Sequence, residues 1–145
     1  MVEYSEEGIF PYPRAQVWKL LDAHLDDTQI VNIHSLIRAQ KTLKRSADEA
    51  LVERTIDARG KLMVSQWKIS MRPPEFYRWE VVSGEGPYAP GSFIESQYSD
   101  ASGGTRMRTH VKARITVLPF FLPQKTVLQR VLSDIDEEDQ AYLKG

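Results

Sequence analysis

The chain has 145 residues, of which 19 are basic and 20 acidic, for a net charge of −1. This length suits a single domain spanning residues 1–145. The charge balance argues against nucleic acid as a partner, and the absence of cysteine excludes disulfides and thiolate metal sites. No apolar run approaches the roughly 20 residues of a membrane span, and the acidic start lacks the pattern of a signal peptide. We therefore expect a cytoplasmic protein with no integral membrane association.

The N-terminal part of the chain predicts one strand and two short helices. Val2 to Phe10 has an extended character, and Pro13 suits the first turn of a helix, where its missing N–H costs nothing. Apolar residues recur at helical spacing from Val17 to His24. A second short helix is predicted over Asp26 to Ile33, capped by one of the two aspartates at its start.

Six extended segments with turn signals between them follow. They are Leu36–Arg45, Ala50–Ala58, Leu62–Arg72, Phe76–Ser83, Ser92–Ser99 and Thr105–Leu118. Connections this short predict an antiparallel meander, because parallel crossovers need a dozen or more residues. In the last segment, one face is mostly apolar from Met107 to Val117, while the other carries a basic row from Arg106 to Arg114. We interpret the basic row as a solvated sheet face, with Glu3 or Glu7 of the first strand as neighbours.

A long helix is predicted to end the chain. Pro123 opens it, and Val127, Leu128 and Val131 begin an apolar stripe along one side. The acidic run at residues 134–139 interrupts this stripe and opposes the helix dipole, so the last turns are the least favoured part of the helix. The predicted class is α+β, with about seven strands in the order β-α-α-β-β-β-β-β-β-α.

Two short motifs resemble those of a known superfamily. Pro13-Arg14-Ala15-Gln16-Val17-Trp18, followed by Leu20-Leu21-Asp22, and Gly103-Gly104-Thr105 are similar to the opening and the final hairpin of helix-grip proteins. These include START lipid-transfer domains, pollen allergens and polyketide cyclase/dehydrase-like proteins; their usual alanine before the proline is Tyr12 here. The resemblance implies a curved antiparallel sheet wrapped around the C-terminal helix. It does not determine the activity, because this fold hosts carriers, sensors, cyclases and partner-binding modules.

In such a fold, a ligand would occupy any space left between the sheet and the helix. With a three-residue turn at Pro73-Pro74, Trp67 would lie opposite Trp79 and Ile69 opposite Tyr77. Neighbouring aromatics suit a flat, apolar ligand, although they equally suit an ordinary core. The residues expected to contact the ligand are Arg54, Trp67, Ile69, Met71, Tyr77, Trp79, Val81, Phe93, Glu95, Met107, Thr109, Val111, Val127, Leu128 and Val131.

Arg54 is the most informative polar residue in this set. The alternation of its strand places it on the inner face, where a guanidinium needs a carboxylate or a ligand anion. Glu95 is that partner if Phe93 and Glu95 face inward, but Ile94, Ser96 and Tyr98 compete for the same face. The alternative interpretation is a bulge or a side chain that reaches solvent.

Two histidines are candidates for chemistry. His34 lies at a junction between helix and strand near the expected cavity mouth, and is the best candidate for acid/base catalysis beside Arg54. The alternative interpretation of His34, and the more common case, is an ordinary surface histidine. His24 continues an apolar stripe and is interpreted as a hydrogen-bonded core residue. No spacing typical of metal ligands is present and no cofactor is demanded.

Three functions therefore remain open. The first is a carrier or sensor of an apolar or amphipathic molecule of the lipid, polyketide or isoprenoid class. The second is a cofactor-independent cyclase or dehydratase that uses polar groups of the cavity. The third is a module that binds a protein partner through the loops at the cavity mouth or the basic sheet face.

Overall fold

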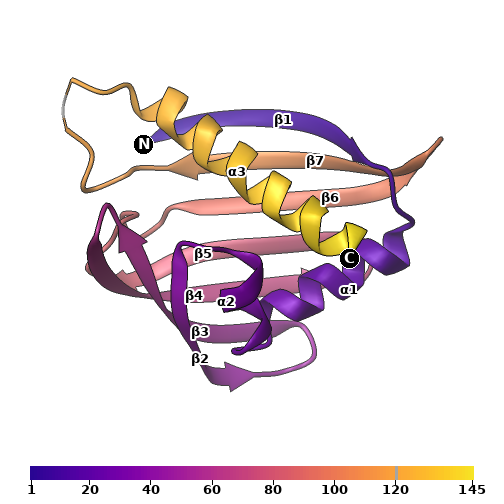
Figure 1. Cartoon of the computed structure of the whole chain (residues 1–145), viewed down its shortest axis with the longest axis horizontal. Helices are drawn as coiled ribbons and strands as arrows, with labels where there is room; N and C mark the ends of the chain where they lie inside the picture. Colours follow the sequence, from indigo (N-terminus) through magenta and orange to yellow (C-terminus); the bar gives the residue numbers. More distant parts are fainter. Residues whose placement is uncertain (120) are drawn as a thin grey trace.

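The computed structural model describes residues 1–119 and 121–145, which form a seven-stranded sheet with helices on one face (Figure 1). The elements are β1 (Val2–Phe10), α1 (Arg14–His24), α2 (Gln29–Ile33), β2 (Ile37–Arg45), β3 (Glu49–Ala58), β4 (Lys61–Arg72), β5 (Phe76–Gly84), β6 (Phe93–Ala101), β7 (Gly104–Ala113) and α3 (Gln124–Lys144). Their order confirms the predicted α+β class.

The sheet is antiparallel throughout, with the strand order β1-β7-β6-β5-β4-β3-β2. Strands that follow one another from β2 to β7 are neighbours because their connections are short. β1 instead pairs with β7, which lies at the other end of the chain. Gly104 allows the end of β1 to lie this close to the start of β7: its φ is +150°, and a Cβ at this position would collide with the carbonyl oxygen of Phe10.

α3 crosses the inner face of the curved sheet and is continuous to Lys144, although its acidic run opposes the helix dipole (Figure 1). Leu128, Leu132 and Leu143 are buried beneath it. The carboxylate of Asp139 is buried against two histidines, and these contacts offset the unfavourable dipole term. Within the described residues, no helix is long and apolar enough to cross a membrane.

The last strand is shorter than predicted, ending at Ala113 instead of Leu118. Beyond this point the chain leaves the sheet, and Ile115 makes only an isolated bridge to Tyr88. The side-chain amide of Gln124 takes over the role of a strand partner: it accepts a hydrogen bond from the N–H of Ile115 (2.8 Å) and donates one to its carbonyl (2.9 Å).

The second helix begins at Gln29, three residues later than predicted. The carboxylate of Asp26 accepts hydrogen bonds from the N–H groups of Thr28 (3.0 Å) and Gln29 (2.9 Å), so Asp26 caps this turn from outside the helix. Asp27 points to β2 instead, where it accepts bonds from the backbone and hydroxyl of Thr42.

The predicted cross-strand pairs of β4 and β5, Trp67 with Trp79 and Ile69 with Tyr77, are wrong by two residues. The turn has three residues, but it lies one place further along the chain, so Trp67 faces Val81 and Ile69 faces Trp79. The two tryptophan rings remain diagonal neighbours, with centroids 6.4 Å apart.

Candidate functional site

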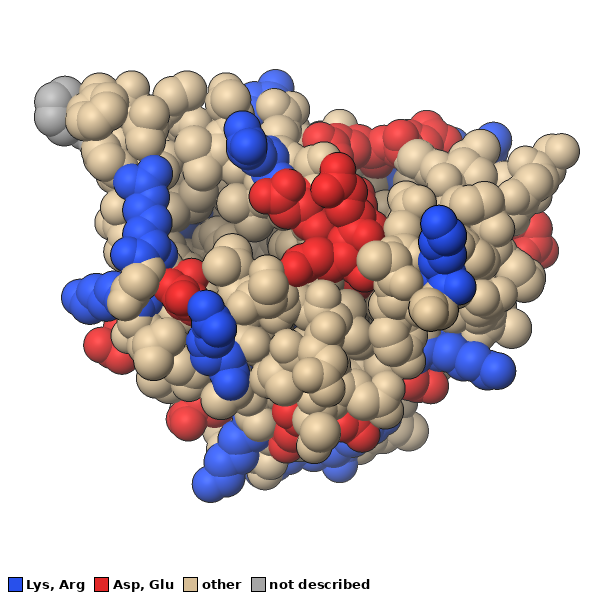
Figure 2. All heavy atoms as spheres, in the orientation of Figure 1, with Lys and Arg blue, Asp and Glu red and all other residues tan. Residues whose placement is uncertain are grey.

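A cavity of about 430 Å³ lies between the inner face of the sheet and α3. Its opening is visible as a hollow beside the acidic side chains of α3 (Figure 2). Apolar and aromatic side chains make up most of the wall: Ile37, Ile56, Trp67, Trp79, Tyr88, Ile94, Val111, Ala113, Leu128, Val131, Leu132 and Ile135. Asp134, Glu137 and Glu138 of α3 form an acidic border.

Arg54 is the buried cation of this wall, with only 1% of its surface exposed. Its Nε donates a hydrogen bond to Oε1 of Gln40 (2.8 Å), and its Cζ lies 4.5 Å from the ring centre of Trp79 and 5.4 Å from that of Trp67. Nη2 is buried and has no hydrogen-bond partner among the described residues. Burial lowers the pKa of Arg54 to about 10, so it remains charged at neutral pH. The wall thus presents an unused charged donor.

Of the two facings left open for β6, the one that would pair Arg54 with Glu95 is not formed. Glu95 lies on the outer face of the sheet, where it accepts hydrogen bonds from Arg78 (2.9 Å) and His110 (3.2 Å). Phe93 borders the cavity, but its ring packs on this outer side against Arg78 and His110. The inner positions of β6 belong to Ile94, Ser96 and Tyr98, which lie opposite the inner residues of β7.

The other residues expected to contact a ligand divide between the cavity and the core. Those on the cavity wall, besides Arg54 and Phe93, are Trp67, Trp79, Val111, Leu128 and Val131. Those in the packed core are Ile69, Met71, Tyr77 and Val81. Met107 and Thr109 border a smaller hollow of about 70 Å³, and Val127 packs beside Leu128 on the β7 side of the core. Contact of any of them with a ligand remains a prediction.

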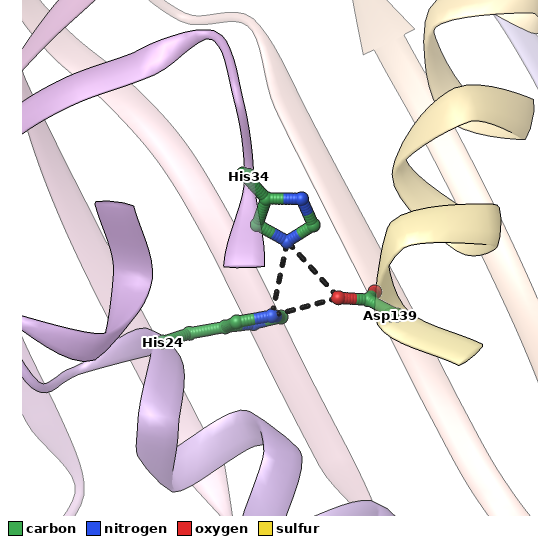
Figure 3. A group of neighbouring side chains, drawn as sticks. All are labelled: His24, His34 and Asp139. Carbon is green, nitrogen blue, oxygen red and sulfur yellow. Dashed lines mark hydrogen bonds and ion pairs between the residues drawn. The ribbon is translucent and has the colours of Figure 1, made fainter. Parts of the chain in front are cut away.

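Beside the cavity, three buried side chains from three elements meet; we call them the His–His–Asp cluster (Figure 3). His24 ends α1, His34 follows α2, and Asp139 lies on α3. Oδ1 of Asp139 is 2.9 Å from Nε2 of His24 and 3.0 Å from Nε2 of His34, and the two Nε2 atoms are 3.1 Å apart. His34 also borders the cavity, as predicted from its place before β2.

The charges of the cluster are interdependent. Burial lowers the pKa of His24, and the charges of His34 and Arg54 lower it further, so the charge and hydrogen bond of Asp139, which raise it, are outweighed. Burial acts in the same direction on His34, but the hydrogen bonds and charges of Asp139 and Glu138 outweigh it and raise the pKa. Burial would raise the pKa of Asp139, yet the two histidines hold it below its usual value. The carboxylate is therefore the stable form at neutral pH.

A second carboxylate orients His34 from outside the cluster. Oε1 of Glu138 is 3.1 Å from Nδ1 of His34, and its other oxygen accepts a hydrogen bond from the N–H of Ser35 (3.0 Å). Nδ1 of His24 has no such partner among the described residues, although the ring is almost fully buried. The ring of Trp79 contacts both His24 and Arg54, so the cluster adjoins the charged part of the cavity wall.

Sequence reasoning found His34 and Arg54 but not the cluster. His24 and Asp139 are 115 residues apart, and Asp139 belongs to the run of acidic residues that interrupts the apolar stripe of the last helix. The apolar stripe that leads to His24 indicated burial, and a buried histidine needs a polar partner. That requirement was the available signal, but it did not identify the partner.

No protein-family model and no curated protein matches this sequence. Solved structures do match. Ara h 8.0201 superposes with a TM-score of 0.76 at 16% identity, covering 98% of this chain and 97% of the other. A START superfamily protein from Mycobacterium smegmatis gives 0.74 at 9% identity, with the same coverage. The Zhui aromatase/cyclase from Streptomyces sp. R1128 gives 0.69 at 11% identity, covering 98% and 90%. The chain therefore has the helix-grip fold shared by these proteins.

Proposed function

We propose that this protein binds an apolar or amphipathic small molecule in the cavity beneath α3, as a carrier or sensor. The observation that carries the proposal is the guanidinium of Arg54, which is buried in a largely apolar wall and whose Nη2 finds no hydrogen-bond partner among the residues that the structure describes. Leaving a buried charged donor unpaired is costly unless a ligand supplies the acceptor.

The wall indicates the shape and chemistry of the ligand. The cavity has a volume of about 430 Å³, which lies in the range of roughly 300–1,000 Å³ that is usual for small-molecule sites. The rings of Trp67 and Trp79 favour a flat apolar body, and Arg54 favours a carboxylate, phenolate or similar anionic group. Lipids, polyketides and isoprenoids with one acidic group meet this description.

Native mass spectrometry of the purified protein, followed by denaturing extraction, tests the proposal directly. A co-purifying compound of this class is the expected result. If the protein is empty, 2-naphthoic acid and its methyl ester serve as probes, and the acid should raise the melting temperature more. Arg54→Met should weaken binding of the acid by about tenfold to a hundredfold, since a hydrogen bond to a charged group contributes about 1.5–3 kcal/mol. The ester should bind both proteins alike.

Arg38→Met is the matched control, because Arg38 is an exposed arginine paired with Asp57 on the surface. It should bind the acid as the unaltered protein does. An empty protein that no probe stabilises would overturn the proposal, as would equal binding of the acid to the Arg54 variant.

Some structural neighbours are named aromatase/cyclases, so the extracted compound should also be compared with the compound supplied: a change in mass would indicate turnover.

A further inference from the structure

We propose that the His–His–Asp cluster is a binding site for one divalent first-row transition metal ion. This goes beyond the proposed function, because the ion would bind next to the ligand cavity and does not depend on a ligand. The donor atoms are Nε2 of His24, Nε2 of His34 and a carboxylate oxygen of Asp139. They come from three elements that only the fold brings together (Figure 3).

The geometry of the three atoms has the dimensions of a coordination site. Their separations are 2.9, 3.0 and 3.1 Å. With metal–ligand bonds of about 2.1 Å, adjacent ligands of an octahedral ion lie about 3.0 Å apart. The triangle therefore matches one face of an octahedron, the arrangement in which two histidines and one carboxylate hold an ion and leave other positions open.

Hydrogen bonds alone satisfy these three atoms poorly. If both histidines donate to Asp139, their two N–H groups also crowd each other across 3.1 Å, and neither nitrogen offers a lone pair to the other. A metal ion accepts a lone pair from each of the three atoms at once. The contact of Glu138 with Nδ1 of His34 fits this state, because a histidine that donates from Nδ1 keeps a bare Nε2 for the metal.

The surroundings supply negative charge and space. Glu6 and Asp136 border the same hollow of about 70 Å³ as His24 and Asp139. A water molecule occupies about 30 Å³ in the liquid, so this hollow has room for waters that complete the coordination. Arg54 opposes a cation here, but it is a single positive charge against these carboxylates and Glu138. The nitrogen-rich donor set favours Zn²⁺, Fe²⁺ or Co²⁺ over Mg²⁺ or Ca²⁺.

Titration of the untagged full chain with Co²⁺ tests the site, because Co²⁺ reports its ligands by visible absorption. We expect one ion per chain by elemental analysis and a ligand-field band that saturates at that ratio. In the unaltered protein, ¹⁵N NMR of the imidazoles with Zn²⁺ should shift Nε2 of His24 and His34 and leave His110 unchanged. His110→Gln is the matched control, since it removes a histidine that also contacts carboxylates but lies on the outer face.

Two variants, one in the cluster and one beside it, complete the experiment. Asp139→Asn should weaken Co²⁺ binding by a hundredfold or more, and Glu138→Gln, which alters only the outer contact of His34, by about tenfold to a hundredfold. If the Asp139 variant fails to fold by circular dichroism, the Glu138 variant and the NMR shifts decide. Failure of Co²⁺ to bind at millimolar concentration overturns the proposal, as does binding that survives Asp139→Asn or moves the His110 signals. Arg54→Met should retain the metal, so this site and the ligand site fail separately.

Discussion

The inner face of the sheet is filled beneath α1 and hollow beneath α3. Under α1, Val17 and Leu21 pack on Ile69, Met71 and Tyr77 in one continuous cluster. Under α3, Leu128 and Leu132 pack on the β7 side of the sheet, and the cavity remains between them and the tryptophans of β4 and β5. Both regions show the same alternation of apolar and polar residues. The difference lies in the side chains that the covering helix, α1 or α3, directs toward the sheet.

α1 turns large apolar side chains toward the sheet, whereas α3 contributes carboxylates at the cavity opening in addition to its apolar side chains. Asp134, Glu137 and Glu138 border the opening, and charged groups of this kind do not fill apolar space. Three of the buried polar residues are connected to one another: Arg54 and Gln40 bond to each other, and Gln40 bonds to the backbone of His24. The alternation of the strands therefore determines which side chains face inward but not whether they meet a partner.

Truncation in the filled region should have the largest effect. Ile69 has no exposed surface, so Ile69→Ala leaves a cavity and should lower the free energy of unfolding by about 2–5 kcal/mol. Val131→Ala, on the cavity wall, should cost less than about 1 kcal/mol. Chemical denaturation measures both, and equal losses would show that the hollow is closed in solution.

Replacing a buried alanine by leucine tests the same difference between the two regions by adding volume instead of removing it. Ala50 belongs to the filled region and Ala113 to the cavity wall, and both are buried. Ala50→Leu should destabilise by about 1–3 kcal/mol through overpacking, while Ala113→Leu should change stability by less than about 1 kcal/mol and weaken binding of 2-naphthoic acid. A similar loss in the two variants would count against free space beside Ala113.

Removing the charge of Arg54 should separate stability from binding. Arg54→Met relieves the desolvation of a buried guanidinium but leaves Oε1 of Gln40 without its donor. These effects oppose each other, so we expect the free energy of unfolding to stay within about 1 kcal/mol, while binding of the acid probe weakens by about tenfold to a hundredfold. A large loss of stability would mean that Arg54 serves the core and not a ligand.

The outer face should give the smallest effect, and one that depends on pH. Hydrogen bonds from His110 to Glu95 and Glu3 raise its pKa above the usual value, so its contribution is full below about pH 6.5 and is lost as the pH rises through the raised pKa. His110→Gln should therefore cost about 0.5 kcal/mol at pH 5.5 and nothing at pH 9. Thermal melts across this range measure the difference, and a loss that persists at pH 9 would contradict the ionic explanation.

Local patterns in the sequence were sufficient for most of the fold. The alternation along β7 correctly predicted the outer pairing of its basic row, with Glu3 contacting His110 and Glu7 contacting Arg106. The facing of β6 was left open because polar and apolar residues occur on both of its faces, and neighbouring strands decide the outcome. The β4–β5 register depended on where a three-residue turn begins, which its two prolines leave open by one position.

The candidate site was predictable only in part, for a physical reason. Arg54 was found because a charge within an apolar alternation stands out along one strand. The His–His–Asp cluster depends on the angle at which α3 crosses the sheet, and packing between distant elements sets this angle. Asp139 looks like its acidic neighbours until the helix has been docked, when it becomes the buried one.

The hydrogen bonds between Gln124 and Ile115 have a consequence for how a ligand enters. They attach the first turn of α3 to the chain just beyond β7, and Asp139 attaches its last turns to the end of α1 and to the residue after α2. α3, which covers the cavity, is thus held at both ends. Moving this helix away from the sheet would break these polar contacts. Ligand exchange is then expected to proceed by rotation of side chains around the opening, with the helix and the sheet remaining in place.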